Sequence, residues 1–473
     1  METLQRTANR GSVSTGYDID FSCKFEADNQ EELLRTPSSA GNRQTWTVSM
    51  WFKFTELGIN QMLFGSSDTY MYLGNDDKMY INYRGAGTNF FLATNRVFRD
   101  TAAFYHFVVV CDATNGTAAD RGRFYVNGVR ETDYQLNTYE NMDSGDSTHW
   151  NNTVAQSIGG QNGSTTFQSC GYMAEVHSVD GSALTSDSFG EFDSDTGIWI
   201  PKAYSGSYGT NGFYLDFADA SDLGDDESGN GNDFAETNLT AADQATDSPT
   251  NNFATFNALQ PLQASGYISE GATKFYTGSN WQTAVSSIAV SKGKWYAEFY
   301  PNSSTTIVGF VDVADIYIPQ NHTGYYLGYA GGNQNRSVGM QGSNGVIMND
   351  NNSATGAGFS GGDIVSLALD MDNRKAYWAV NGTYVNSGDP ANGTNGVTWA
   401  TSSTLGDDWT DIITMGVTGY TNIIWLGNFG GFTTMPISSG NADGNGYGNF
   451  EYAPPSGFYS ICSKNLAEFG GTA

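Results

Sequence analysis

The chain has few basic residues for its length. Among 473 residues there are 21 Lys and Arg against 50 Asp and Glu, which gives a formal net charge of −29. Binding to a nucleic-acid backbone requires clustered Lys and Arg side chains around the phosphates. The charge therefore argues against a nucleic-acid partner. It leaves two explanations for the acidity, a solvated surface that keeps a crowded protein soluble and a dedicated cation-binding face.

Cysteine is also scarce, and the four cysteines are too widely spaced for a zinc motif. Cys111 follows the apolar run 107–110, so we expect a buried thiol there, whereas a Cys23–Cys170 disulfide stays open. No apolar run approaches the length of a membrane span, and the first residues lack the basic-then-apolar pattern of a secretory signal. We therefore expect synthesis in a cytoplasm and no membrane insertion.

The sequence also lacks the motifs of several enzyme classes. It contains no H-E-x-x-H and no G-x-x-x-x-G-K-[ST], and its four histidines are scattered singly. A retaining glycosidase needs two carboxylates about 5.5 Å apart, which a Glu-x-Asp-x-Glu strand can place on one face. The nearest stretch, EFDSD at residues 191–195, ends in Asp and lies among turn residues. We expect no enzymatic activity.

Glycine and aromatic residues are abundant, with 58 Gly, 27 Tyr, 28 Phe and 10 Trp. Glycine supplies tight turns, while aromatic and β-branched side chains suit a pleated, half-buried surface. No long stretch shows helical spacing of Ala, Leu, Glu and Lys. The composition predicts an all-β fold, and the length suits two domains with room for a connector.

Three segments of the first 200 residues have strong strand patterns. Residues 45–54 (TWTVSMWFKF) alternate with period two, as a half-buried strand does. Residues 105–112 and 123–130 flank a polar turn, and Asn127-Gly128 within the second segment is a strong hairpin signal because both residues tolerate positive φ. Residues 171–177 (GYMAEVH) form a further strand.

The order of these motifs resembles a known sandwich family. The segments YHFVVV (105–110), RFYVNGV (123–129) and GYMAEVH (171–177) are similar to strands of the concanavalin A-like, laminin G-type domain. The resemblance implies a jelly-roll β-sandwich over residues 1–200. Residues 201–262 follow as an extended polar connector, within which residues 212–217 could form a strand that returns to the first sandwich.

Residues 263–473 form the second predicted unit. Its motifs follow the order GKWY (293–296), GYYLGY (324–329), GDIV (362–365) ending in DMD (370–372), and a strand closing on NG (381–382). This order resembles a SPRY domain, which implies a second antiparallel β-sandwich. In the two units we expect core positions for six aromatic residues, Trp46, Phe52, Phe124, Trp295, Trp378 and Phe429.

The connector contains the best candidate for a cation site. Ca²⁺ prefers six to eight oxygen ligands, and laminin G-type domains often bind one Ca²⁺ near a loop. Five carboxylates lie within twelve residues there, namely Asp222, Asp225, Asp226, Glu227 and Asp233. The alternative is a solvated cluster of Asx turns whose side chains cap their own backbone. Ca²⁺ is the one cofactor that the sequence suggests.

A lectin-like fold rich in aromatic residues also suggests carbohydrate binding, since sugar rings stack on exposed aromatic side chains. Most aromatic residues must fill the two cores. Four lie in turn-rich segments where we expect exposure, and they are the candidate ligand-binding residues: Trp150, Trp281, Tyr325 and Trp409.

The tandem as a whole resembles structural proteins of tailed, especially marine, bacteriophages. The shared landmarks are TPSSAGNR (36–43), PTNNFAT (249–255) and PSGF (455–458), the last followed by Cys462 and Asn465-Leu466. The resemblance implies a protein on the virion exterior, made in the bacterial cytoplasm and contacting other virion proteins. We expect a tail-fibre or spike component that binds host carbohydrate or protein, as a homo-oligomer with a trimer favoured. The alternative is a head fibre or capsid decoration protein with protein–protein contacts only.

Overall fold

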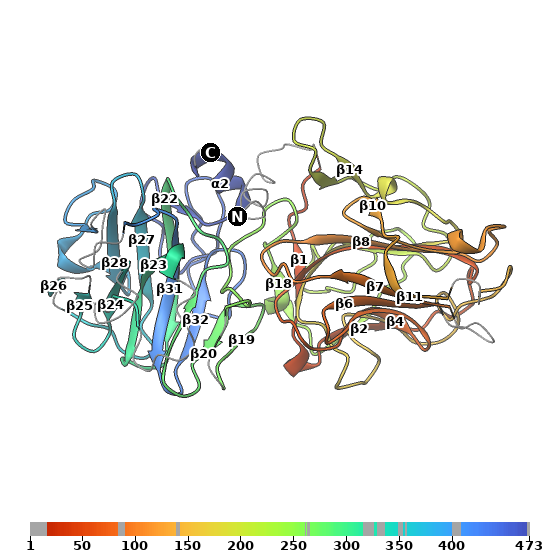
Figure 1. Ribbon diagram of the computed structural model, residues 1–473, viewed down its shortest axis with the longest axis horizontal. Helices are drawn as coiled ribbons and strands as arrows, with labels where there is room; N and C mark the ends of the chain where they lie inside the picture. Colours follow the sequence, from red (N-terminus) through yellow and green to blue (C-terminus); the bar gives the residue numbers. More distant parts are fainter. Residues whose placement is uncertain are drawn as a thin grey trace. The chain divides into compact units, whose positions relative to one another are not determined.

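The computed structural model describes residues 17–83, 90–138, 142–260, 262, 265–315, 326–328, 336–348, 353–354, 357–399 and 408–470. These residues fold into two units, and the boundary lies between Thr250 and Asn251. In each unit, two mainly antiparallel sheets enclose a hydrophobic core (Figure 1). The predicted class, all-β with two tandem sandwiches, is confirmed.

The first unit consists of two sheets, called here the β3 sheet and the β5 sheet. In spatial order, the β3 sheet contains β10 (Val129–Arg130), β9 (Gly122–Val126), β8 (Tyr105–Asp112), β3 (Thr45–Phe54), β13 (Gly171–Asp180), β1 (Ser22–Phe25) and β18 (Gln244–Ala245), with β16 (Phe213–Leu215) paired to β13. The β5 sheet contains β11 (Tyr134–Asn137), β7 (Phe91–Val97), β6 (Lys78–Tyr83), β5 (Thr69–Leu73), β4 (Gln61–Ser66), β12 (Gln156–Ile158), β2 (Glu32–Arg35) and β17 (Ala235–Thr237). A separate hairpin joins β14 (Gly190–Phe192) to β15 (Trp199–Pro201).

Strand β3 shows how the period-two pattern builds this unit. Its alternate residues from Trp46 to Phe54 point into the core, where they meet Met71 and Leu73 of β5. The residues between them, such as Ser49, lie on the opposite face of the sheet. On that outer face Thr47 bonds to Ser182 and Leu184, and Lys53 pairs with Asp247, so nearly the whole strand is buried.

The predicted hairpin between β9 and β10 is present. Asn127 and Gly128 have φ angles of 48° and 82°, which are the positive values that a tight two-residue turn requires. Val126 and Val129 face each other on the two strands that the turn connects.

The predicted connector, residues 201–262, is wrong as a separate segment. Its predicted returning strand is β16, which pairs with β13, while β17 pairs with β2 and β18 pairs with β1. The few apolar residues in this polar stretch, including Phe213, Leu223 and Phe234, are buried in the first core. Residues from Asn251 onward belong to the second unit, where Phe256 enters the core. Burial of these sparse side chains makes the stretch an integral part of both sandwiches.

The second unit again has two sheets, called the β22 sheet and the β23 sheet. The β22 sheet contains β19 (Tyr267–Ser269), β20 (Lys274–Tyr276), β32 (Ile424–Asn428), β22 (Lys294–Pro301), β27 (Val365–Asp370), β28 (Lys375–Val380) and β29 (Thr383–Tyr384), with β30 (Val397–Thr398) beside β28 and β33 (Tyr459–Ser460) parallel to β22. The β23 sheet contains β21 (Trp281–Val285), β31 (Ile413–Tyr420), β23 (Thr306–Asp312), β24 (Ser337–Gln341), β25 (Val346–Met348) and β26 (Ser353–Ala354). Helix α2 (Ser463–Phe469) follows β33 and packs on the same core.

The aromatic residues predicted for the two cores all lie there. At most 1% of the surface is exposed for each of them: Trp46, Phe52, Phe124, Trp295, Trp378 and Phe429. Cys111 is buried as predicted, and all four cysteines are free, so Cys23 and Cys170 form no disulfide.

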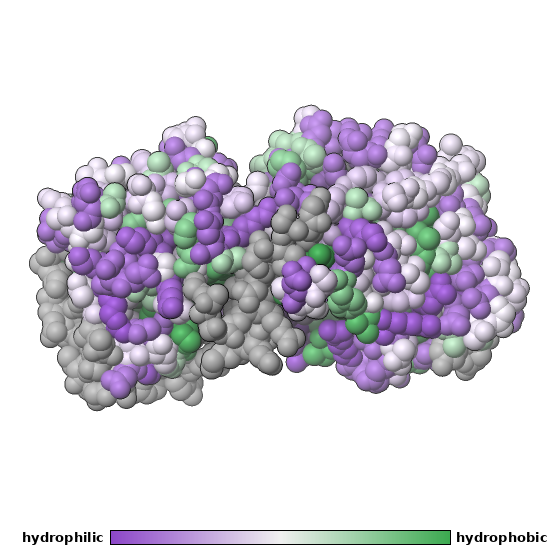
Figure 2. Space-filling model, turned by 90° about the horizontal axis from the view of Figure 1, so that it is seen from above, coloured by the Kyte–Doolittle hydropathy of each residue, from purple (hydrophilic) through white to green (hydrophobic). Residues whose placement is uncertain are grey.

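One face of the molecule shows how polar and apolar residues are distributed on the surface. The face in Figure 2 is mostly hydrophilic, and its hydrophobic residues lie in small separate areas. No helix in the described part of the chain is long and apolar enough to cross a membrane.

Candidate functional site

A row of aromatic side chains lies on the outer face of the β5 sheet. Tyr70 and Tyr72 come from β5, Tyr80 from β6 and Phe91 from β7. Their sequence neighbours, such as Met71 and Leu73, point into the core, so the alternation of the strands directs these rings outward. Phe167, from the loop before β13, contacts Tyr72. We call these five residues the aromatic row.

The rings of the aromatic row form a nearly continuous surface. Centroids of Tyr70 and Tyr72 are 5.8 Å apart, those of Tyr72 and Tyr80 are 5.0 Å apart, and those of Tyr80 and Phe91 are 6.0 Å apart. All five side chains are half-buried. Partly exposed aromatic faces on a rigid sheet can bind the apolar C–H face of a sugar ring, while the hydroxyl groups offer hydrogen bonds.

Polar groups flank this surface. The Tyr80 hydroxyl donates a 3.0 Å hydrogen bond to Asp76, and Lys78 donates to Gln135 of β11. Burial raises the pKa of Tyr72 to about 12, so its hydroxyl remains protonated and can donate at neutral pH. The row therefore has both the stacking faces and the hydrogen-bonding groups of a carbohydrate site.

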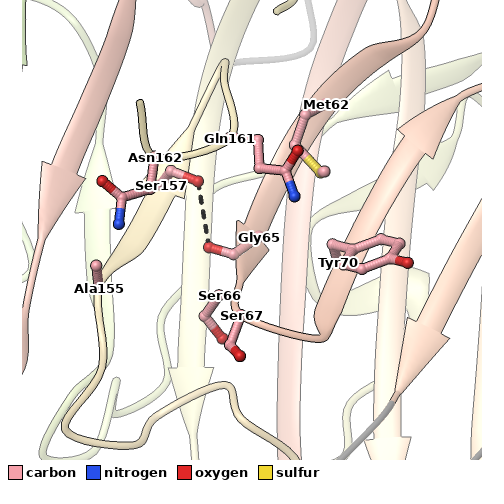
Figure 3. Close-up of a pocket in the computed structure, with 9 residues that line it drawn as sticks. All are labelled: Met62, Gly65, Ser66, Ser67, Tyr70, Ala155, Ser157, Gln161 and Asn162. Carbon is pink, nitrogen blue, oxygen red and sulfur yellow. Dashed lines mark hydrogen bonds between the residues drawn. The ribbon is translucent and has the colours of Figure 1, made fainter. Parts of the chain in front are cut away.

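A small pocket opens beside Tyr70 (Figure 3). Its lining residues are Met62, Gly65, Ser66, Ser67, Tyr70, Ala155, Ser157, Gln161 and Asn162. Ser157 Oγ donates a 3.3 Å hydrogen bond to the Gly65 carbonyl oxygen. Ser66 Oγ is buried and has no hydrogen-bond partner among the described residues. A ligand hydroxyl in the pocket would satisfy this group.

The outer face of the β3 sheet carries a Ser–His pair that has the wrong proton arrangement for a nucleophile. Ser49 Oγ lies 2.8 Å from His106 Nε2, and Trp199 Nε1 donates a 3.0 Å hydrogen bond to His106 Nδ1. An indole N–H can only donate, so Nδ1 of the neutral ring carries no proton and Nε2 does. Burial lowers the pKa of His106 to about 3. His106 therefore donates to Ser49 and cannot take its proton.

A second polar cluster on the same face surrounds Glu175. The Tyr17 and Tyr214 hydroxyls each donate a 2.6 Å hydrogen bond to its carboxylate, and His177 Nε2 lies 3.2 Å away. Glu175 has a φ of 51° at a register shift between β13 and β3, so a β-bulge directs the carboxylate into this cluster. Burial by itself would raise the pKa of Glu175. The hydrogen bonds from His177 and the two tyrosines outweigh burial, so the pKa of Glu175 lies below its usual value.

The predicted ligand-binding tryptophans have different environments. Trp150 is fully buried, its ring packs 5.0 Å from Phe64, and its Nε1 donates to Ser178. Trp409 is 9% exposed and packs near Phe310. The expectation that these two rings are exposed is wrong, because turn-rich segments fold back over the cores.

Trp281 remains a candidate. It is half-buried at the start of β21, and its ring lies 4.8 Å from Tyr326 and 5.2 Å from Tyr420. Tyr325 lies outside the described residues. The structure thus brings Trp281 together with two other aromatic residues, Tyr326 and Tyr420.

Three of the five predicted cation residues, Asp222, Asp226 and Asp233, cap backbone N–H groups in or beside their loop. Asp226 is buried, and its carboxylate accepts hydrogen bonds from the backbone N–H groups of Tyr214, Ser228 and Asn232. Asp222 and Asp233 cap backbone groups of the same loop, those of Gly224 and Asp226. Burial is the largest cause of the raised pKa of Asp225, and neighbouring carboxylates add to it. For Glu227 the neighbouring carboxylates, Asp216 first, are the main cause of the raised pKa.

One other cluster of potential metal ligands occurs among the described residues. Glu26, Glu56 and Cys170 have ligand atoms within 4.8 Å of one another. Burial raises the pKa of the Cys170 thiol well above its ordinary value, so the thiol stays protonated and donates to both carboxylates. In this structure the three side chains are therefore linked by hydrogen bonds from the thiol.

Two segments that resemble catalytic motifs have structural roles. Asp193 caps the turn of the β14–β15 hairpin by accepting hydrogen bonds from Thr196, and Glu191 is exposed on β14. The pattern G-x-S-x-G occurs at residues 358–362, but Ser360 lies in an exposed turn that leads into β27. A nucleophile elbow needs a strand-to-helix turn.

The aromatic row was not among the residues singled out from the sequence. Its signal is the alternation of tyrosine with apolar residues in TYMYL (69–73) and in KMYINY (78–83). In TYMYL both tyrosines fall on the face opposite to Met71 and Leu73, which indicates a strand whose outer face also carries aromatic side chains. The residues singled out from the sequence were chosen for expected exposure in turns, whereas four members of the aromatic row lie on strands and the fifth, Phe167, lies in the loop before β13.

Comparison with known proteins supports the first sandwich. The profile of the concanavalin A-like lectin/glucanases superfamily matches residues 28–188, a range that contains the whole aromatic row. No curated protein sequence matches the chain.

Solved structures with a similar chain trace include SPRY domains and a bacterial protein. The SPRY domain of human HERC1 is 14% identical over 38% of this chain and 99% of its own, with a TM-score of 0.28. A human SPRY domain is 14% identical over 33% of this chain and 92% of its own, with a TM-score of 0.23. A proposed carbohydrate-binding protein from Bacteroides ovatus is 14% identical over 40% of this chain and 55% of its own, with a TM-score of 0.27.

Proposed function

We propose that the chain is a glycan-binding attachment protein without enzymatic activity. The observation that carries the proposal is the aromatic row on the outer face of the β5 sheet, with the unsatisfied Ser66 hydroxyl in the pocket beside Tyr70. Stacking faces next to hydrogen-bonding groups are the requirements of a sugar, which presents apolar C–H faces and hydroxyl edges. The match to a lectin/glucanase superfamily over residues 28–188 supports the glycan-binding part of the proposal.

Binding without turnover is supported by the proton arrangement at His106. Trp199 occupies its Nδ1 as a donor, so His106 cannot act as a base toward Ser49. The experiment is a glycan array probed with the full chain, followed by incubation of the bound glycans and analysis for cleavage products. We expect retained binding and intact glycans. Accumulation of shorter products would refute the non-enzymatic assignment, and no binding to any glycan would refute the attachment assignment.

We further propose that the protein is carried on the exterior of a bacteriophage particle as a tail-fibre or spike component. The support is the sequence resemblance around residues 36–43, 249–255 and 455–458. Immunogold labelling of purified particles with antibody to this chain tests the placement. Label at the tail tip, together with block of adsorption by soluble protein, is the expected result, and particles without label would exclude it.

A capsid decoration protein is the second candidate. It is favoured by the absence, within the described ranges, of a long helix that could form a coiled-coil stalk. Label spread over the head, with adsorption unaffected by soluble protein, would select this alternative.

A further inference from the structure

A buried lysine contacts two carboxylates near the β18 edge of the β3 sheet. Lys24 Nζ, on β1, lies 2.8 Å from Asp243 Oδ1 and 3.0 Å from Glu31 Oε1. The side chains of Lys24, Glu31 and Asp243 are 2%, 2% and 10% exposed. Taking these charges out of water is costly, and the attraction within a buried ion pair often fails to offset that cost. A reaction that removes the charges of the amine and of one carboxylate would relieve it.

The strand register holds the amine and the carboxylate together. β1 pairs with β18 so that Cys23 faces Gln244. Continued by one residue, this antiparallel register places Lys24 opposite Asp243. Asp243 is also fixed by the capping box of the short 3₁₀ helix η6 (Ala241–Asp243). Two reacting groups that the fold holds in contact react far faster than the same groups free in solution.

The other oxygen of the Asp243 carboxylate is held by hydrogen-bond donors. Oδ2 accepts a 2.8 Å hydrogen bond from the Thr240 backbone N–H and a 3.1 Å hydrogen bond from the Thr240 hydroxyl. When an amine adds to a carboxyl carbon, negative charge develops on one oxygen, and donors already aimed at that oxygen stabilise it. Thr240 supplies such donors to Oδ2. Oδ1, which faces Lys24, is the oxygen in position to leave.

Glu31 is suited to carry protons in this cluster. Its Oε1 contacts Lys24 and accepts a 3.0 Å hydrogen bond from Asn29, whereas its Oε2 is buried and has no hydrogen-bond partner among the described residues. Burial is the largest influence on this carboxyl and raises the pKa of Glu31 to about 7, although Lys24 opposes the rise. A group with a pKa near the ambient pH can both accept and release a proton.

The amine needs such a base before it can react. Burial alone would lower the pKa of Lys24, but the two carboxylates raise it above its ordinary value, so the amine is protonated at rest. Only the neutral amine has the lone pair that attacks a carboxyl carbon. The carboxylate of Glu31 touches Nζ and can take the proton.

We propose that Lys24 and Asp243 condense to an intramolecular amide, with Glu31 as the proton carrier. Glu31 takes a proton from Lys24 Nζ, and the nitrogen lone pair forms a bond to Asp243 Cγ. The bond between Cγ and Oδ1 then breaks with its electron pair. Oδ1 leaves as water, with two protons that come from Nζ one after the other through Glu31. Oδ2 becomes the amide carbonyl oxygen, Glu31 returns to its starting state, and no oxidant, reductant or other reactant is required.

The amide would enclose nearly the whole first unit in one covalent ring. That unit runs to Thr250, and the ring runs from residue 24 to residue 243. A pull between the residues before Lys24 and the second unit would pass through the amide and bypass the first sandwich. A cross-link over a long loop also restricts the unfolded chain, as a disulfide does, and so stabilises the folded one. Neither linked residue belongs to the aromatic row, so the amide is independent of glycan binding.

Intact mass spectrometry of the full chain, denatured after incubation at neutral pH, tests for the amide. We expect a mass lower than that of the sequence by one water molecule. Proteolysis should then release one branched peptide that contains both Lys24 and Asp243. A wild-type chain with the full sequence mass would overturn the proposal, as would a link through another buried pair such as Lys53 and Asp247.

The Lys24→Arg variant separates the amide from the ion pair. Its guanidinium keeps a positive charge between the two carboxylates but forms no such amide, so we expect a folded chain by circular dichroism with the full sequence mass. The matched control is Lys202→Arg, in the exposed ion pair with Glu191, which should still lose one water molecule. A loss of water that persists in Lys24→Arg would come from another group, such as an aspartyl succinimide, and would overturn the proposal.

The Glu31→Gln variant tests the proton carrier. Its amide oxygen can still accept hydrogen bonds from Lys24 and Asn29, but it does not take up a proton. We expect amide formation, followed as mass loss over time after refolding, to slow about 100-fold. A rate equal to that of the wild type would contradict the role of Glu31, while the branched peptide of the wild type decides whether the amide itself forms.

Discussion

Tyr72 and Tyr80 stack face to face across β5 and β6, with ring centroids 5.0 Å apart and planes 14° apart. The strand register places the two residues directly opposite each other. Tyr70, Phe91 and Phe167 contact this pair from its sides. The pair is therefore the centre of the aromatic row, where a bound sugar ring would contact the most aromatic surface.

Replacement of Tyr72 or Tyr80 by Ala should weaken glycan binding. Each substitution removes a stacking face from the centre of the row, and central aromatic residues carry much of the energy of a binding surface. We expect at least a tenfold rise in Kd, equivalent to about 1.4 kcal/mol. Calorimetric titration with a glycan identified on the array measures it.

The control for this effect is Tyr267→Ala. Tyr267 is 47% exposed in the second unit and lies 5.1 Å from Tyr276, so its loss removes a comparable exposed aromatic pair. Its Kd should equal that of the wild type. If Tyr72→Ala and Tyr80→Ala bind as well as this control, the aromatic row is not the glycan site.

The sequence predicted correctly those strands and turns whose conformation depends on residues close together in the chain. Strand β3 follows its period-two pattern, and the Asn127-Gly128 turn has the expected positive φ angles. Local sterics and burial of one face act over a few residues, so they leave a clear local pattern.

The predictions that failed depended on contacts between distant residues. Trp150 stands in a polar, turn-rich segment, yet its indole packs on Phe64 and donates to Ser178. Phe213 and Phe234 are isolated apolar residues in a stretch of Gly, Asn and Asp, and they meet only after β16 pairs with β13. No local pattern shows which isolated aromatic residue is buried, because its partner lies elsewhere in the chain.

Disruption of the buried ion pair between Lys53 and Asp247 should destabilise the first unit. Lys53 Nζ lies 2.7 Å from Asp247 Oδ2, and the side chains are 0% and 1% exposed. Lys53→Met leaves a buried carboxylate without its cation, which costs about 3–5 kcal/mol. Urea unfolding of the full chain, followed by tryptophan fluorescence, measures the change.

The double variant Lys53→Met with Asp247→Leu separates the charge from the packing. Replacement of both members of a buried pair by apolar residues is often neutral, so we expect most of the lost stability to return. A double variant as unstable as Lys53→Met would show that the lost charge is not the cause.

Acidification should destabilise the first unit through His106. Its pKa is lowered to about 3 by burial, whereas an unfolded histidine has a pKa of about 6.5. Between these pH values the unfolded chain binds a proton that the folded chain does not, so stability falls as pH decreases from 6.5 toward 3. The loss is at most about 5 kcal/mol. In calorimetry of the full chain, the stability of the first unit should depend less on pH in His106→Asn than in the wild type. The amide oxygen of the new Asn side chain can still accept the hydrogen bond from Trp199 Nε1.

Glu298 should give the second unit a pH dependence of opposite sign. Its side chain is fully buried and accepts hydrogen bonds from the Tyr296 hydroxyl and from the backbone N–H groups of Glu451 and Tyr452. Burial is the main cause that raises its pKa from 4.5 to about 7, and the hydrogen bonds oppose it. Between pH 4.5 and 7 the folded chain holds a proton that the unfolded chain has released. Stability therefore falls as pH rises through this window, by at most about 3 kcal/mol.

The Glu298→Gln variant separates the titration from the packing at this position. The amide N–H group of the new Gln side chain would point at a hydrogen-bond donor where Glu298 has an accepting oxygen. Two donors that face each other are unfavourable, so we expect the variant to be less stable than the wild type at pH 5. Its pH slope should nevertheless vanish, because the amide does not titrate. The His106→Asn variant identifies which calorimetric unfolding transition belongs to the first unit. Calorimetry at pH 5, 6 and 8 then gives the pH dependence of the other transition, which belongs to the second unit. An unchanged slope in Glu298→Gln would mean that Glu298 is ionised throughout this range and that its four hydrogen-bond donors, with Asn428 as the fourth, outweigh burial.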